Sequence, residues 1–164
     1  MKRKLRIHER ILAIDLHPKR YGYAVLEAPE ELLDWGVKRI NGHCPRQRSL
    51  SRGLRSLMEV WSPSLVAMRQ PLRAVPVRTR KLLRDLTDEV TRYGIPVIRI
   101  SQGPENLHHP TKDVLASSLV RQFPFLAHML PRKRRIWESE DYRISIFVAI
   151  ALALAVNRPC NANH

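Results

Sequence analysis

The chain has 164 residues, enough for one domain with a substantial core and too few for two. Its 29 lysines and arginines outnumber its 15 acidic residues, so the formal charge is +14 and a polyanion, most commonly nucleic acid, is the expected partner. Two cysteines, Cys44 and Cys160, have no paired spacing. This argues against a disulfide framework or a zinc site and fits a reducing, cytoplasmic compartment.

Residues 11–27 form a predicted hairpin around which the rest of the chain is organised. Two apolar runs flank a short basic turn, and the first run contains one acid, Asp15. A lone charge within a strand is unfavourable unless something pairs it. Asp15 is therefore expected either to be satisfied by turn amides, Lys19 or Arg20, or to act as a metal ligand or proton acceptor at the edge of a sheet.

The remaining pattern alternates helices and strands. The first three strands are expected to form an antiparallel meander, and two later strands, each reached through a helix, should lie parallel to the first. Gly36 is a candidate β-bulge. The expected strands after the hairpin are 31–40, 64–70 and 96–101, and the expected helices are about 47–61, 78–93, 111–123 and 141–156.

The domain organisation is simple. Residues 1–10 are expected to be a basic N-terminal arm, residues 11–157 one domain, and residues 158–164 a flexible tail. The apolar stretch 144–156 is shorter than the roughly 20 residues that cross a bilayer. A buried core helix and no membrane association are therefore expected.

Two segments resemble the RuvC-type nucleases of the RNase H-like superfamily. The pattern of an apolar residue, Ile and Asp, a short turn, then Gly-x-Ala-Val is matched by Ile14-Asp15 and by Gly22-Tyr23-Ala24-Val25. The basic run before Trp137 and the following segment are similar to the C-terminal part of uncharacterised bacterial RuvC-like proteins. The resemblance implies an α/β, RNase H-like fold with a five-stranded mixed sheet in the order 3-2-1-4-5, helices on both faces, and a homodimer.

The resemblance also implies a metal site. Such nucleases hold two divalent ions, Mg²⁺ or Mn²⁺, with carboxylates on the first strand, on the fourth strand and near the start of the last helix. Asp15 matches the first position. Asp141, with Glu138 and Glu140 nearby, matches a position at the last helix, although these acids are also typical of an ordinary helix start.

Two acids that the family pattern requires are replaced in this chain. The end of the fourth strand has Arg69 and Gln70, and the register leaves both positions open. At the last helix, Val148 stands where the family has an Asp. Gln70 offers only a neutral oxygen and Arg69 repels a metal, so we expect cleavage to be lost or weak.

Basic residues provide a predicted nucleic-acid surface, and Trp137 is a candidate for base stacking. Adjacent histidines, His108 and His109, are interpreted as a loop feature rather than a metal pair. The candidate phosphate contacts are Lys19, Arg20, Arg73, Arg78, Arg80, Lys81, Arg84, Arg132, Lys133, Arg134 and Arg135.

Three functional hypotheses follow. The first is a protein of RuvC-like fold that binds branched or double-stranded DNA, rather than RNA, with little or no cleavage, in the bacterial cytoplasm or nucleoid. The second is an active Mg²⁺-dependent, structure-selective endonuclease like a Holliday junction resolvase, using Asp15, Glu138 and Asp141. The third is a basic scaffold or ribosome-associated protein. The two replaced acids favour the first hypothesis over the second, and salt-dependent binding to branched DNA would separate the first from the third.

Overall fold

The computed structural model describes residues 9–40, 46–70, 75–100, 111–133 and 135–157. The predictions for Cys44, Arg73, His108, His109, Arg134, Cys160 and the two chain ends lie outside these ranges. The elements are β1 (Arg10–Leu16), β2 (Arg20–Glu27), β3 (Glu31–Arg39), α1 (Arg46–Trp61), β4 (Leu65–Arg69), α2 (Val77–Arg92), β5 (Val97–Ile100), α3 (Lys112–Gln122), the 3₁₀ helix η2 (Pro124–Met129) and α4 (Ile144–Asn157).

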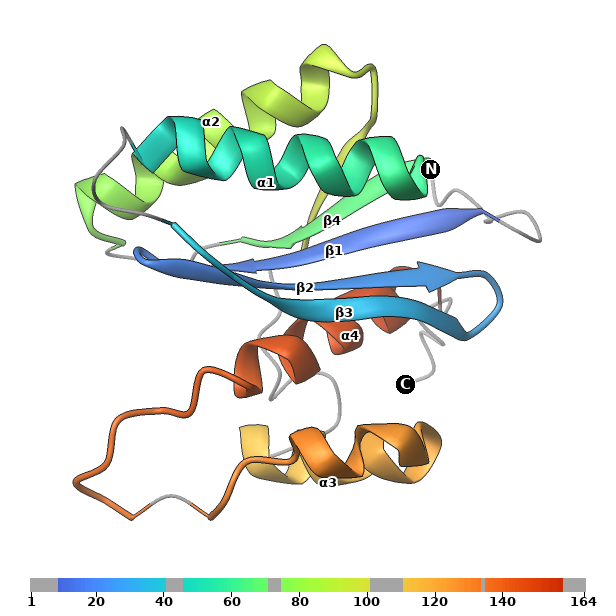
Figure 1. Ribbon diagram of the computed structural model, residues 1–164, viewed down its shortest axis with the longest axis vertical. Helices are drawn as coiled ribbons and strands as arrows, with labels where there is room; N and C mark the ends of the chain where they lie inside the picture. The colour runs from blue at the N-terminus through green and yellow to red at the C-terminus, as the bar shows by residue number, and fades with distance from the viewer. Residues whose placement is uncertain (1–8, 41–45, 71–74, 101–110, 134, 158–164) are drawn as a thin grey trace, which may run out of the picture.

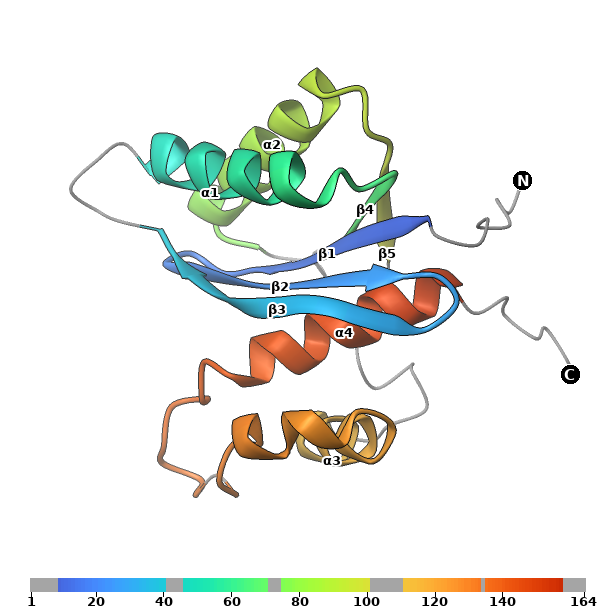
Figure 2. The same ribbon diagram turned by 45° about the vertical axis from the view of Figure 1, so that its right-hand side comes forward.

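The five strands form one mixed sheet in the order β3-β2-β1-β4-β5, as expected. β1, β2 and β3 pair as an antiparallel meander, whereas β4 is parallel to β1 and β5 is parallel to β4. Helices α1 and α2 cover one face of the sheet, and α4 covers the other with α3 packed beyond it (Figures 1 and 2). The prediction of helices on both faces is therefore confirmed.

Alternation along β1 divides the core into two layers. Ile11 and Ala13 belong to the apolar cluster that includes α4, whereas Leu12 and Ile14 belong to the cluster that includes α1 and α2. Because side chains on a strand alternate between faces, Asp15 continues the row of Ile11 and Ala13 and lies on the α4 face. The acid is therefore directed at the terminal helix.

The last helix begins later than the sequence pattern predicted. α4 starts at Ile144, and residues before it form a turn in which the Arg143 amide donates to Asp141 Oδ1 at 2.9 Å. An Asp that accepts from the backbone two residues further on is typical of a helix cap and keeps its own backbone outside the helix. The expected start of the last helix at about residue 141 is therefore wrong.

The expected bulge at Gly36 is also wrong. The register shift between β2 and β3 lies between Val25 and Leu26, while Gly36 pairs with Tyr23 in regular register. A Cβ on Gly36 would lie 3.1 Å from the ring of Tyr23. The glycine thus leaves room for a cross-strand aromatic ring rather than interrupting the pairing.

Helix α4 forms the centre of the core on its side of the sheet. Every residue from Ile144 to Leu154 is buried. Across the described ranges, none of the helices is both long and apolar enough to cross a membrane. The apolar character of α4 is therefore explained by burial inside this domain.

Candidate functional site

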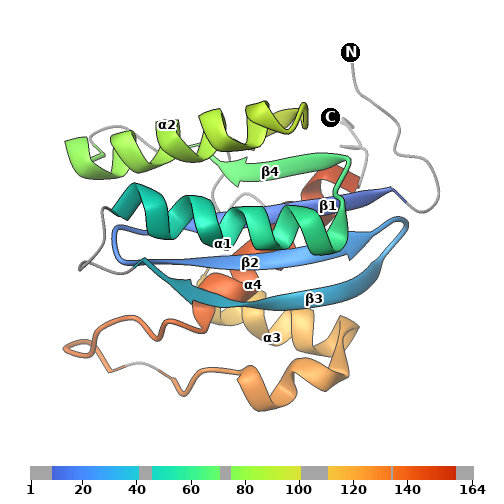
Figure 3. The same cartoon turned by 45° about the horizontal axis from the view of Figure 1, so that its top comes forward.

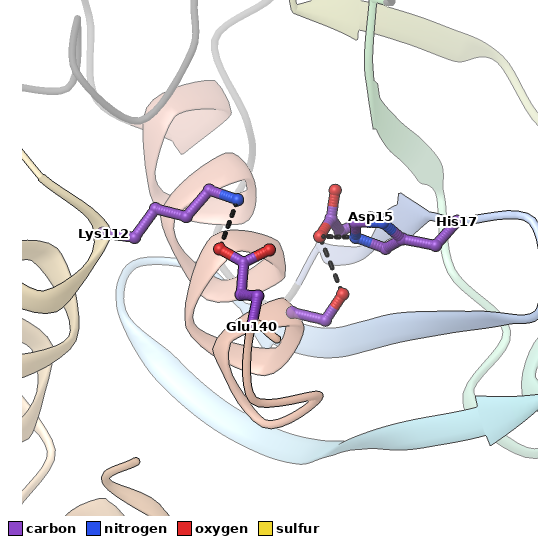
Figure 4. A network of polar contacts seen from close by, with 5 residues as sticks. Asp15, His17, Lys112 and Glu140 are labelled. Atoms are coloured by element: carbon purple, nitrogen blue, oxygen red, sulfur yellow. Dashed lines mark hydrogen bonds and ion pairs between the residues drawn. The ribbon is translucent and has the colours of Figure 1, made fainter. Parts of the chain in front are cut away.

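Asp15 lies at the end of β1, only 4% exposed, with two side-chain partners on one oxygen (Figure 4). The Ser145 hydroxyl in the first turn of α4 donates to Asp15 Oδ2 at 2.7 Å. The His17 ring nitrogen Nε2 donates to the same oxygen at 2.8 Å. The carboxylate is therefore satisfied by one residue two positions away in the chain and by one residue 130 positions away.

Gly22 allows α4 to approach the sheet at this point. It pairs with Asp15 across β1 and β2. A Cβ at this position would lie 2.5 Å from the backbone carbonyl atoms of Ser145 and 2.6 Å from its Cβ, closer than atoms can pack. Only glycine, which has no side chain, permits this contact without movement. Gly22, the glycine of the opening motif, therefore leaves room for Ser145 to lie within hydrogen-bond distance of Asp15.

Asp15 is ionised at neutral pH despite its burial. Burial acts to raise the pKa of the carboxyl group, but the hydrogen bond and electrostatic interaction with His17, the hydrogen bond from Ser145 and the charge of Arg69 together lower that pKa below its ordinary value of 3.8. A buried carboxylate with this set of partners is a fixed negative charge.

Arg69 is the fourth-strand residue that neighbours Asp15. The parallel register pairs Ile11 with Leu65 and Ile14 with Met68, so the next position along brings Arg69 beside Asp15. Leu65 belongs to the α4-side cluster, and alternation directs Arg69 to that same face. A cation therefore stands next to the strand-one carboxylate.

Gln70, the alternative position on the fourth strand, and Val148, the replaced position on α4, differ in their surroundings. Gln70 is exposed just beyond β4, and its backbone amide donates to the Ile100 carbonyl at 2.8 Å. Val148 is 1% exposed and lies within the apolar cluster of the α4 face. A carboxylate at position 148 would therefore be enclosed by apolar side chains, which is costly without a paired cation.

Each of the acidic residues before α4 is bonded to a cation or a backbone amide, and none of these partners is Asp15, His17 or Ser145. Asp141 forms an ion pair with Arg143 at 2.6 Å, and this hydrogen bond, acting against partial burial, lowers the pKa of Asp141. Glu140 forms an ion pair with Lys112 of α3 at 2.7 Å (Figure 4). Glu138 Oε2 accepts from the Arg135 amide at 3.1 Å.

The residues that the structure describes do not fit a centre for two divalent ions. Among the described residues, no three His, Cys, Asp or Glu side chains converge as metal ligands would. Asp15 is bonded to Ser145 and His17, and its strand neighbour Arg69 would repel a metal. The predicted partner of Asp15 at the last helix, Asp141, is neutralised by Arg143 instead.

The described basic candidates gather at one end of the sheet. β1 and β4 finish at this end, where the β1–β2 turn, the start of α2 and the segment before α4 also lie (Figures 1, 2 and 3). Those on α2 and before α4 are exposed, as is Lys19 in the turn, whereas Arg20 is half-buried. The candidates on these elements are Lys19, Arg20, Arg78, Arg80, Lys81, Arg84, Arg132, Lys133 and Arg135, of which Arg84 is near the middle of α2.

Sequence reasoning missed the partners of Asp15. It expected turn amides, Lys19 or Arg20, whereas the structure has His17 and Ser145. His17 follows Asp15 by two residues, which directs both side chains to one face of an extended segment, and this spacing was an available signal. Ser145 was visible only as a hydroxyl within an otherwise apolar run.

Comparisons with known proteins agree with this architecture. No family model matches the chain. A protein of Synechococcus sp. strain WH7803, described as crossover junction endodeoxyribonuclease RuvC, is 28% identical over an alignment of 130 residues; the match covers 69% of this chain and 82% of the relative.

Solved structures extend the similarity over most of the chain. Thermus thermophilus RuvC in complex with a Holliday junction substrate matches with a TM-score of 0.67 and 19% identity, covering 90% of this chain and 92% of that one. The fowlpox virus Holliday junction resolvase matches with a TM-score of 0.60 and 14% identity, covering 89% and 96%. With the strand order β3-β2-β1-β4-β5, these similarities show that the chain has the RuvC-like form of the RNase H-like fold.

Proposed function

We propose that this protein binds branched or double-stranded DNA and has lost, or retains only weakly, the metal-dependent cleavage that its fold supports elsewhere. The observation that carries the proposal is the pairing at the ends of β1 and β4. Asp15 lies on the α4 face and accepts hydrogen bonds from Ser145 and His17, and the neighbouring position on β4 is Arg69. A site of this composition attracts a phosphate but has no set of anionic ligands to hold two metal ions.

The proposed binding surface is the end of the sheet where the basic residues gather. Arg69 supplies a positive charge beside Asp15 at the end of β4, and the exposed cations of α2 and of the segment before α4 are the candidate phosphate contacts. The similarity to resolvases, one of them solved with a Holliday junction, supports DNA and specifically a branched form as the ligand. The formal charge of +14 supports the same conclusion.

The competing function is an active Mg²⁺- or Mn²⁺-dependent endonuclease that uses Asp15, Glu138 and Asp141. The ionised state of Asp15 is compatible with it. Metal binding would, however, require Asp141 to release Arg143 and Glu138 to release the Arg135 amide. Breaking the Asp141–Arg143 ion pair and the Glu138–Arg135 hydrogen bond would each reduce the free energy of metal binding, which a preformed metal site avoids. We therefore favour DNA binding without efficient cleavage.

Binding is tested by measuring affinity for a four-way DNA junction and for a linear duplex with the same arm sequences, over a range of salt concentrations. We expect tighter binding to the junction and a steep loss of affinity with salt, with log K falling by about 0.9 per log unit of salt for each phosphate neutralised. An affinity that barely changes with salt would contradict polyanion binding and favour the scaffold hypothesis.

Cleavage is tested by incubating the same junction and a flap substrate with Mg²⁺ or Mn²⁺. We expect little or no product. Robust turnover that Asp15→Asn abolishes would overturn the proposed loss of cleavage. Asp113→Asn is the matched control, because Asp113 is an exposed acid in the first turn of α3.

Two further parts of the proposal concern the setting of the protein. The resemblance to resolvases implies a homodimer, which sedimentation analysis of the free protein and of its junction complex would test. The similarity to a RuvC protein from a bacterium supports a bacterial origin, with a location in the cytoplasm on nucleoid DNA. Chromatin immunoprecipitation of the protein that recovers no chromosomal DNA would count against this location.

A further inference from the structure

Two large apolar side chains stand almost fully in solvent on a turn before α4. Ile136 is 95% exposed and Trp137 is 78% exposed. The turn is closed at both ends, because the Glu138 amide donates to the Arg135 carbonyl at 3.1 Å and the Arg135 amide donates to Glu138 Oε2 at 3.1 Å. The central pair is therefore displayed by a defined backbone turn, which we name the Ile136–Trp137 tip.

This exposure differs from that of another surface aromatic in the same layer. Phe125 is 48% exposed, but its ring lies 5.1 Å from that of Trp35 and 5.9 Å from that of Phe123. It thus contributes to a packed aromatic group. Among the described residues, the ring of Trp137 has a guanidinium above it and no aromatic neighbour of this kind. Its surface is therefore available to a binding partner.

The charges around the tip favour a polyanion. The Arg135 guanidinium lies 5.9 Å from the centre of the Trp137 ring, and Arg132 and Lys133 are exposed just before it. The segment before α4 lies toward the end of the sheet where β1 and β4 finish, and it loops away from the β1–β2 turn toward the level of α3 (Figures 1 and 2). The aromatic ring and its neighbouring cations thus form one exposed basic tip on the segment before α4.

We propose that Trp137 stacks on a base exposed at the branch point of a DNA junction, while Arg132, Lys133 and Arg135 contact the flanking phosphates. This inference rests on the proposed function and adds how branched DNA would be distinguished from a duplex. Bases inside a continuous duplex are already stacked and cannot accept the indole, whereas a branch point can present an unstacked base. Cations beside the ring contact phosphate in either form.

A membrane surface is the alternative partner for an apolar tip with basic neighbours. Stable membrane attachment generally needs a long amphipathic helix or an acyl chain as well as a basic patch. Here the exposed apolar surface is two side chains on a turn. DNA therefore fits the tip better than a bilayer.

The test compares Trp137→Ala, Trp137→Phe and the control Tyr93→Ala in the full chain. Tyr93 is an aromatic that is 40% exposed, at the C-terminal end of α2, away from the proposed surface. Trp137→Ala is expected to weaken binding to the four-way junction about tenfold and to leave the duplex affinity within about twofold, in line with the usual contribution of base stacking. Trp137→Phe should retain most of the junction affinity, and Tyr93→Ala should bind both DNAs like wild type.

A second readout follows the indole directly. Junction DNA should quench the part of the fluorescence that is lost in Trp137→Phe, and duplex DNA should quench it much less. Because position 137 is exposed on a turn, each variant should keep the wild-type thermal midpoint.

The outcomes separate this inference from the proposed function. If wild type binds neither DNA in a salt-dependent way, the proposed function itself fails. If wild type prefers the junction and Trp137→Ala binds it equally well, or if the variant loses affinity equally for junction and duplex, the stacking inference alone is overturned. It is also overturned if Trp137→Ala keeps its junction affinity but no longer binds vesicles of phosphatidylserine and phosphatidylcholine, since the tip would then be a membrane contact.

Discussion

Two groups of acids in this molecule look alike in the sequence and differ in the structure. Asp15 is buried, and one of its partners, Ser145, is 130 residues away. Asp141 and Glu138 lie on the surface segment before α4 and are bonded to Arg143 and Arg135, two and three residues away. One acid is held by the tertiary fold, whereas the others are satisfied by the local chain.

This difference between tertiary and local partners indicates which acids depend on the fold. An acid paired with a near neighbour retains its partner when the surrounding fold shifts, so it contributes little to the shape of the site. Gly22 lets α4 dock on β2, which places Ser145 against the buried Asp15, and the Ser145 hydrogen bond adds to the effect of His17 in lowering the pKa of Asp15. Changes around Asp15 should therefore alter the whole domain, and changes at Asp141 should remain local.

The largest effect is expected for Gly22→Ala. The new methyl group would overlap the Ser145 backbone, so α4 must move away from β2 and the Ser145 bond to Asp15 must lengthen. We expect a loss of about 3 kcal/mol in the free energy of unfolding, at the upper end for overpacking. Urea denaturation measures it.

Gly36→Ala is the matched control for this loss, because its methyl group would meet only the ring of Tyr23, which can turn aside. Equal losses for the two variants would contradict the close contact between β2 and α4.

A second large effect is expected for Arg69→Glu. Two carboxylates would then stand side by side at the ends of β1 and β4. Their repulsion should lower stability by about 2 kcal/mol without metal, and Mn²⁺ should restore part of it. Thermal unfolding with and without Mn²⁺ tests this, and the variant should also bind DNA less tightly.

Gln70→Glu is the control for Arg69→Glu, because position 70 is exposed and follows the strand on its other face. If Mn²⁺ stabilises Gln70→Glu as much as Arg69→Glu, the assignment of position 69 as the neighbour of Asp15 is wrong.

Ser145→Ala should have an intermediate effect that depends on pH. The pKa of Asp15 is lowered in the folded state, so its stabilising contribution is present above about pH 4, the unfolded value, and is lost as the pH falls through the folded value. Removing the Ser145 bond should cost about 1.5 kcal/mol near neutral pH. The difference in the free energy of unfolding between wild type and variant should become smaller below pH 3.8, the ordinary pKa of an Asp carboxyl group.

Urea denaturation at neutral and acidic pH measures this gap. Ser117→Ala is the control, because Ser117 is exposed on α3. A gap that stays constant down to acidic pH would mean that the hydroxyl stabilises something other than the Asp15 carboxylate.

The smallest effect is expected for Asp141→Asn. Asparagine keeps the capping geometry, so mainly the ion pair with Arg143 is lost. A surface pair of this kind contributes less than about 1 kcal/mol, and salt screens it. A loss as large as that of Ser145→Ala, measured by urea denaturation, would remove the distinction between the two groups of acids.

Much of the fold was predictable because its signals are local. The alternating apolar residues of β1 and β2, the helical stripes of α1 and α2, and the element order led to a five-stranded sheet with helices on both faces, as observed. The start of α4 was misjudged by three residues, since the side chain of Asp141 competes for the backbone amide of Arg143. The bulge was assigned to Gly36 because composition does not reveal which strand residue lacks a partner.

For the candidate site, the sequence by itself indicated that Asp15 would lie on a strand, and that a cation or an amide and an aliphatic side chain would stand where the RuvC-like pattern has acids. Only the tertiary structure decided that Arg69, and not Gln70, lies beside Asp15, and that the Ser145 hydroxyl donates a hydrogen bond to the Asp15 carboxylate. The physical reason is that residue type and periodicity are properties of a segment. Which side chains meet depends instead on strand register and on how closely a glycine such as Gly22 lets a helix approach.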